Sequence, residues 1–247
     1  MTMSREQPLL SCFVLHARKY RDTSLLVDVF SREQGRFTVV ARGARSAKSR
    51  FSYQPFVPVL MRCFGRGELK TAAGVEAGGV AYQLVGRNLM IGMYANELLY
   101  RLLGKYVPIE SLYDRYETLL LALQADASTT LVLRRFELSL LADLGYGVSF
   151  DIEAETGDPI DATASYGFRP ENGFYRMPDE IHEVSIRSNG TDAIRAVAGE
   201  DLLAIADGRL DSANDRVARW VVRQSIDQLL DGKPLNSRKL FAGMPRS

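Results

Sequence analysis

The sequence predicts an α+β protein with a small β-barrel first and an all-helical domain after it. Five short runs with the alternating apolar pattern of strands fall within the first 80 residues, and a helical period begins near residue 86. We expect the barrel at residues 1–80 and the helical domain at 81–247, with a small acidic insert at about 145–190. The chain has 247 residues, 46% hydrophobic and 25% charged, which is ordinary for a globular protein.

The strands of the barrel are expected at residues 9–20, 24–31, 36–42, 55–64 and 68–75. In the first, Cys12, Val14 and His16 alternate with apolar neighbours and should share one face. A closed or partly closed barrel of five strands is typical of the OB-fold, the commonest platform of this size for single-stranded nucleic acid. The pattern alone fits an SH3-like barrel nearly as well.

The helical domain begins with apolar stripes at helical spacing over residues 86–104, 111–124 and 128–144. Further helices are expected at 191–198 and 201–206, and a final one from an N-cap at Ser212 to Gly232. Between them the chain is rich in turn residues, and Glu171-Asn172-Gly173 is typical of a β-hairpin. We therefore expect a hairpin-like insert within the helices.

Charge is distributed unevenly, although the net charge is only +1. Residues 1–80 carry 13 Lys and Arg against 6 Asp and Glu, whereas residues 145–215 carry 5 against 15. Residues 216–247 are basic again, with 7 against 2. A basic first domain indicates an anionic partner outside the chain.

The strongest local excess lies between Gly35 and Lys70, where eight cations face one acid, Glu68. Aromatic residues interleaved with cations on a barrel suit single-stranded nucleic acid, which needs base stacking and phosphate neutralisation. A solvated basic loop is the alternative. The candidate DNA-binding residues are Arg36, Arg42, Arg45, Lys48, Arg50, Phe51, Tyr53, Arg62, Arg66 and Lys70.

Arg134 and Arg135 form a second candidate site, within an apolar helix. In one interpretation one arginine is exposed and the other forms a salt bridge to Glu137 or Asp143. In the other, an arginine beside an apolar groove binds the carboxylate of a partner peptide. The groove would be formed by Leu133, Phe136 and Leu140.

Several classes of site find no support. With Cys12, Cys63, His16 and His182 as the chain's cysteines and histidines and no CxxC pair, a zinc site is not expected. No pattern of a catalytic site or bound cofactor stands out, so we expect a protein that is not an enzyme and has no cofactor. No apolar run reaches the ~18 residues of a membrane span and the N-terminus lacks a signal peptide, so we expect a cytoplasmic location.

Four segments of the chain stand out together: GRFTVVARGAR, QPFVPVLMRCFGRGELKT, LRRFELSLLADLGYG and GKPLNSRKLF. In this order they resemble the RecO family of bacterial recombination mediators. The resemblance covers nearly the whole chain. It implies an OB-fold followed by a helical domain, in a cytoplasmic protein associated with the bacterial nucleoid.

The resemblance also implies partners. The family binds single- and double-stranded DNA, anneals complementary strands, acts with RecR, and helps RecA to displace the single-stranded-DNA-binding protein SSB; participation of RecF stays open. The DNA surface would be the basic residues of the barrel, and the acidic, apolar SSB tail would meet Leu133, Arg134, Arg135, Phe136 and Leu140.

Many members of the family carry a cysteine zinc knuckle after the GYG segment, but residues 145–190 contain no cysteine. If the knuckle shape persists, we expect side-chain packing to hold it, through Phe168, Phe174 and Tyr175. Two other functions stay open from the residues alone. One is a structural adaptor without DNA affinity, and the other is a metal-dependent nuclease that uses the acidic residues Asp151, Glu153, Glu155 and Asp158.

Overall fold

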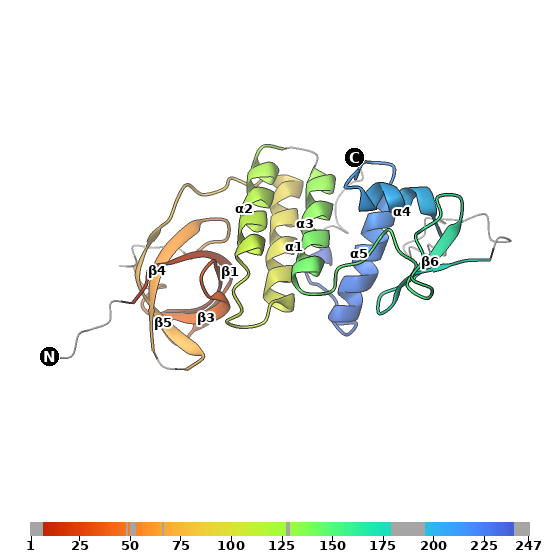
Figure 1. Cartoon of the computed structure of the whole chain (residues 1–247). Helices are drawn as coiled ribbons and strands as arrows, with labels where there is room; N and C mark the ends of the chain where they lie inside the picture. Colours follow the sequence, from red (N-terminus) through yellow and green to blue (C-terminus); the bar gives the residue numbers. More distant parts are fainter. Residues whose placement is uncertain are drawn as a thin grey trace. The chain divides into compact units, whose positions relative to one another are not determined.

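The computed structural model describes residues 7–47, 49, 53–65, 67–126, 129–178 and 196–239. Contacts between residues divide the chain into two compact units, residues 1–127 with 235–247 and residues 128–234. The first unit holds the barrel and two helices, and the second holds three helices and a small sheet (Figure 1). The domain boundary expected near residue 80 stays a prediction.

Five strands close into the barrel with the order β1-β2-β3-β5-β4 (Figure 1). They are β1 (Leu10–Tyr20), β2 (Ser24–Ser31), β3 (Gly35–Ala41), β4 (Pro58–Phe64) and β5 (Leu69–Ala77). All neighbours are antiparallel except β3 and β5, which run parallel. A closed five-stranded barrel followed by helices confirms the predicted fold class.

The barrel interior is filled by alternating apolar residues such as Val27, Val39 and Met61, which have no exposed surface. One prediction about β1 is wrong. Cys12 and Val14 point inward as expected, but His16 lies outside and is half exposed. The pairing of β1 with β2 shifts between Val14 and His16, and such a bulge changes which face the following side chains occupy.

Helices α1 (Gly86–Leu102) and α2 (Glu110–Gln124) cover one part of the barrel's outer surface (Figure 1). There the outward-facing Phe13 and Phe30 of β1 and β2 are fully buried. Their rings lie 5.3 and 5.4 Å from that of Tyr113, and Tyr116 meets Phe13 edge-on at 5.1 Å. This aromatic layer joins α2 to the barrel.

The chain's later part returns to the first unit. Leu235 is buried, and the amides of Asn236 and Ser237 donate hydrogen bonds of 2.8 and 2.7 Å to the Glu97 carboxylate on α1. The Ser237 hydroxyl donates a third, of 2.6 Å. One carboxylate therefore anchors the segment that follows the second unit.

The second unit is built from three helices and a three-stranded sheet. Its elements are α3 (Thr129–Asp143), β6 (Ser165–Arg169), β7 (Gly173–Arg176), β8 (Val197–Ala198), α4 (Gly199–Ala206) and α5 (Asp215–Leu229). The sheet has the order β7-β6-β8 and packs on α5 through Phe168 and Trp220, whose rings are 5.7 Å apart. Among the helices of the described residues, none is long and apolar enough to span a membrane.

The sequence-based boundaries need three corrections here. Residues 197–198 form β8 rather than the end of a helix, and 191–195 lie outside the described residues. The last helix begins after Asn214 instead of Ser212, because the Asn214 side chain accepts from the Asp211 amide and closes a turn first. Helix α2 likewise begins one residue before the expected cap, Ser111.

The β6–β7 hairpin confirms the predicted insert, and aromatic packing holds it. Phe174 lies 5.0 Å from Phe168 and 5.4 Å from Phe150. The Tyr175 ring instead lies over Gly167, and the Arg169 guanidinium stacks on it, 4.1 Å from the ring centre. Phe168 and Phe174 therefore lie in the core of the unit as expected, whereas Tyr175 packs at its edge.

Two acidic residues of the insert are engaged by the hairpin itself. Glu153 is buried and accepts a hydrogen bond from the Arg176 amide at 3.2 Å, while Glu155 forms an ion pair with Arg169 at 2.6 Å. Within the described part of the chain, no group of three His, Cys, Asp or Glu side chains could hold a metal ion. The Glu153 and Glu155 carboxylates therefore stabilise the hairpin.

Candidate nucleic-acid interface

One row of outward-facing side chains crosses every strand of the barrel, and each of them is at least partly exposed among the described residues. The backbone register places Arg18 beside Leu26, Leu26 beside Val40, Val40 beside Thr71, and Thr71 beside Phe64. Facing residues of neighbouring strands point to the same side of a sheet. Arg18 and Phe64 at the ends of the row are exposed, and Leu26 and Val40 between them are half-buried. The row forms a shallow, mostly apolar floor with a cation at one end.

Three arginines gather at the end of the barrel where β1 and β3 finish. Arg42 follows β3 and is exposed. Arg45 donates from its guanidinium to the Arg21 carbonyl at 3.2 Å and from its amide to the Thr23 carbonyl at 2.9 Å. Arg45 thus fastens its loop to the β1–β2 turn, where Arg21 has a left-handed backbone (φ 49°). This pairing brings cations from two loops together.

Other predicted DNA-binding residues are held by the protein itself. Arg36 is half-buried, donates to the Leu103 carbonyl at 2.9 Å, and lies 5.5 Å from the Tyr100 ring. Lys70 pairs with Val39 of β3, and its ammonium lies 5.2 Å from the centre of the Tyr106 ring. Both cations still contribute positive potential, but their donors are partly used.

Arg62 and Tyr53 differ in their surroundings. Arg62 is half-buried on the outward face of β4, and its Nε is buried without a hydrogen-bond partner among the described residues. Tyr53 packs against the barrel core, and burial raises the pKa of its hydroxyl to about 12. A half-buried tyrosine offers little ring for stacking. Lys48, Arg50, Phe51 and Arg66 lie outside the described residues.

The sequence reasoning missed the cations of β1 and its following turn. Arg18 and Lys19 are exposed at the end of β1, and the Arg21 guanidinium lies 5.1 Å from the ring of Tyr20. The signal was present as the run Arg18-Lys19-Tyr20-Arg21. It lies outside the stretch from Gly35 to Lys70, and only the pairing of strands brings it beside Arg42.

On α3, Arg134 has the structural role. It is only 4% exposed and forms ion pairs with the buried Glu137 and, at 3.2 Å, with Asp215 of α5. The ion pair with Glu137 confirms one of the two salt bridges weighed from the sequence, and peptide binding by the neighbouring arginine stays a prediction. Arg134 is therefore a tie between two helices of the second unit.

The apolar residues predicted to form a groove on α3 are not freely accessible. Phe136 and Leu140 are buried, and Leu133 is half-buried. Arg135 is exposed, and the half-buried Leu131 and Leu138 occupy positions four before and three after it. Residues at that spacing share one face of a helix. An exposed cation flanked by leucines therefore remains as a candidate contact for an acidic, apolar tail.

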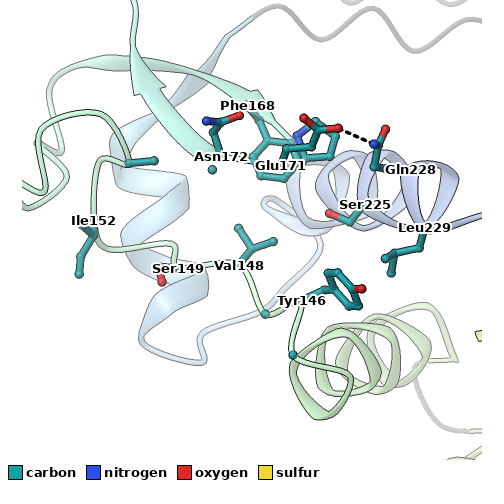
Figure 2. Close-up of a pocket in the computed structure, with 15 residues that line it drawn as sticks. Tyr146, Val148, Ser149, Ile152, Phe168, Glu171, Asn172, Ser225, Gln228 and Leu229 are labelled. Carbon is teal, nitrogen blue, oxygen red and sulfur yellow. Dashed lines mark hydrogen bonds between the residues drawn. The ribbon is translucent and has the colours of Figure 1, made fainter. Parts of the chain in front are cut away.

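A hollow of about 750 Å³ lies elsewhere in the second unit, and none of the five predicted tail-binding residues lines it. Figure 2 shows it between the segment after α3, the β6–β7 turn and the end of α5. Tyr146 and Leu229 lie on one side, and a 2.6 Å hydrogen bond from Gln228 to Glu171 closes the other. The side chain with a formal charge in this lining is an acid, which does not suit an acidic ligand.

Comparison with known proteins agrees with this architecture. Residues 3–78 match the family model "Recombination protein O N terminal", and residues 84–239 match "Recombination protein O C terminal". The DNA repair protein RecO of Vibrio parahaemolyticus is 38% identical over 239 residues, which is 96% of this chain and 93% of that protein. RecO of Shigella flexneri is 41% identical over 233 residues, covering 93% and 91%. The chain therefore belongs to the RecO family of DNA repair and recombination proteins.

Proposed function

We propose that this chain binds single- and double-stranded DNA on the open outer surface of its barrel and anneals complementary strands. In repair it would act with RecR and help to load RecA onto strands coated by SSB. The chain would catalyse no reaction itself. The observation that carries the proposal is this row of partly exposed side chains on the barrel, which includes the exposed Arg18 and is followed along β3 by the exposed Arg42.

The physical basis is release of counterions from the phosphate backbone. A face that neutralises phosphates with exposed arginines binds any sequence, and its affinity falls steeply with salt. Two strands held on such a face repel each other less, because their charges are partly neutralised. The same surface can therefore support both binding and annealing.

We further propose that the SSB tail contacts the second unit at Arg135. Arg135 supplies a cation for the tail's carboxylates, and Leu131 and Leu138 supply apolar surface on the same helix face. Arg134 is engaged with Glu137 and Asp215, so it is not the residue we assign to the tail. Arg135→Glu should abolish tail-peptide binding and leave DNA affinity unchanged.

The experiment that tests the DNA-binding proposal is annealing of complementary labelled oligonucleotides at two salt concentrations, with and without SSB. We expect annealing that weakens as salt rises and that survives SSB coating. Binding to RecR without salt-sensitive DNA affinity would instead show a structural adaptor. Metal-dependent cleavage of the labelled strands would show a nuclease.

A further inference from the structure

An exposed apolar surface interrupts the otherwise ordinary outside of the barrel. Phe64 at the end of β4 and Leu69 at the start of β5 are each 47% exposed. Phe64 faces Thr71 across the ladder, which makes Leu69, two residues earlier on β5, its diagonal neighbour on the same outward face. Exposed apolar residues scattered singly need no explanation, but neighbouring ones mark contact surfaces.

The contrast with other outward phenylalanines of the barrel shows that this exposure is specific. Phe13 and Phe30 also point outward from their strands, and both are fully buried under Tyr113 and Tyr116 of α2. Phe64 lies on the part of the sheet that this helix leaves open. Its ring has no such cover among the described residues.

The charges around Phe64 favour an anionic partner. Arg62 lies two positions earlier on the same strand and therefore on the same face, about 7 Å away along the chain. A methyl group added at Gly74 would lie 3.6 Å from Arg62 Nη1, so the guanidinium extends across β5. The nearby acid Glu68 is paired with Lys105 at 2.8 Å, and this pairing lowers the pKa of the Glu68 carboxyl.

We infer that Phe64 is a base-stacking residue, and that Leu69 and Arg62 hold the unpaired base and its phosphate beside it. The inference rests on the proposed DNA binding and adds to it a residue that tells single strands from duplex. An unpaired base can place its face on an aromatic ring, whereas bases of a duplex are already stacked. Phosphate contacts such as that of Arg42 serve both kinds of strand alike.

The test separates stacking from charge. In Phe64→Ala we expect affinity for a labelled poly-dT oligonucleotide to fall roughly 5- to 100-fold, as truncation of a stacking aromatic does. The slope of log K against log salt should stay as in the wild type, because no phosphate contact is lost. Affinity for a hairpin duplex should change less than twofold. Phe64→Leu, which keeps apolar bulk without a ring face, should lose affinity as Phe64→Ala does, and Phe64→Tyr should retain it.

Tyr146→Ala is the matched control, since Tyr146 is an exposed aromatic, 57% accessible, in the second unit. It should bind like the wild type. Wild-type affinity for poly-dT in both Phe64→Ala and Phe64→Leu would overturn the inference. If, in addition, the wild type gained mass with concentration in sedimentation and these two variants did not, the surface would be an interface for self-association. Absence of salt-sensitive DNA binding in the wild type would instead refute the proposed function itself.

Discussion

The ion pair network of α3 offers the sharpest test of how the second unit is held together. Arg134 and Glu137 are 4% and 2% exposed, and the Asp215 side chain is 15% exposed. Arg134→Met removes the guanidinium but keeps most of the apolar stem. The Glu137 carboxylate then stays buried without its cation, which typically costs about 3–5 kcal/mol.

That cost sets the size of the measurable effect. With a typical urea slope of roughly 2 kcal/mol per molar, the midpoint of unfolding should fall by about 1.5–2.5 M. Trp220 is the chain's one tryptophan and lies in the core of this unit, so its fluorescence reports the unfolding of the unit. Arg135→Met, on the exposed face of the same helix, is the matched control and should change stability by less than about 0.5 kcal/mol.

Removing the charges of both Arg134 and Glu137 distinguishes the cost of one buried unpaired charge from the net stability of the ion pair. Arg134→Met with Glu137→Leu should recover most of the lost stability, because a buried ion pair exchanged for apolar side chains is often nearly neutral. If the midpoint of Arg134→Met matched that of Arg135→Met, the network would not carry the stability assigned to it. A stable Arg134→Met that lost the SSB tail peptide would show that Arg134 is a contact residue after all.

Three substitutions in the first unit have further measurable effects. Arg42→Glu should weaken binding to all DNA sequences and reduce the salt slope on single strands by about 0.7, measured by fluorescence anisotropy from low to high salt; an unchanged slope would remove Arg42 from the interface. Gly35→Ala should destabilise the barrel by more than about 1 kcal/mol in thermal unfolding, because φ is +70° and the added methyl would lie 2.0 Å from the Val107 carbonyl oxygen. Burial raises the pKa of the Glu97 carboxyl, but hydrogen bonds from Ser237 and Asn236 lower it by more, so the pKa in the folded protein lies below its ordinary value. The carboxylate is protonated, and the anchoring is lost, as the pH falls through this lowered pKa. Glu97→Gln at pH 7 should therefore speed amide exchange at Ser237 by about tenfold or more, and unchanged protection would contradict the anchor.

Much of the fold follows from local pattern. Alternation of apolar residues predicts all five barrel strands to within a few residues, and helical spacing predicts α1, α2 and α3 equally well. The alternating pattern places His16 on the wrong face, because a bulge adds one residue to β1 and shifts the alternation after it. Local pattern also fails at Val197 and Ala198, which pair with β6 although a helix was expected over residues 191–198.

The candidate DNA surface was harder to predict, because the tertiary fold determines which groups of the protein each cation contacts. Arg36 lies in the richest basic stretch, yet its guanidinium bonds to a carbonyl 67 residues away. Arg18 lies outside that stretch, yet the strand pairing carries it to the same row as Val40 and Phe64. Counting charges along the chain therefore identifies a basic domain but does not show which of its cations the fold itself engages.

The same reasoning explains how the insert can keep a hairpin without cysteine. A zinc knuckle fixes two turns by tying four ligands to one ion, so each turn needs little core of its own. Here the turn around Glu153 is tied by backbone and carboxylate bonds to β7, with the Ala154 amide donating to the Phe174 carbonyl at 2.8 Å. Phe174 is fully buried against Phe168 and Phe150. Aromatic burial thus supplies the cohesion that a metal would supply, and a chelator should leave the unfolding of this unit unchanged.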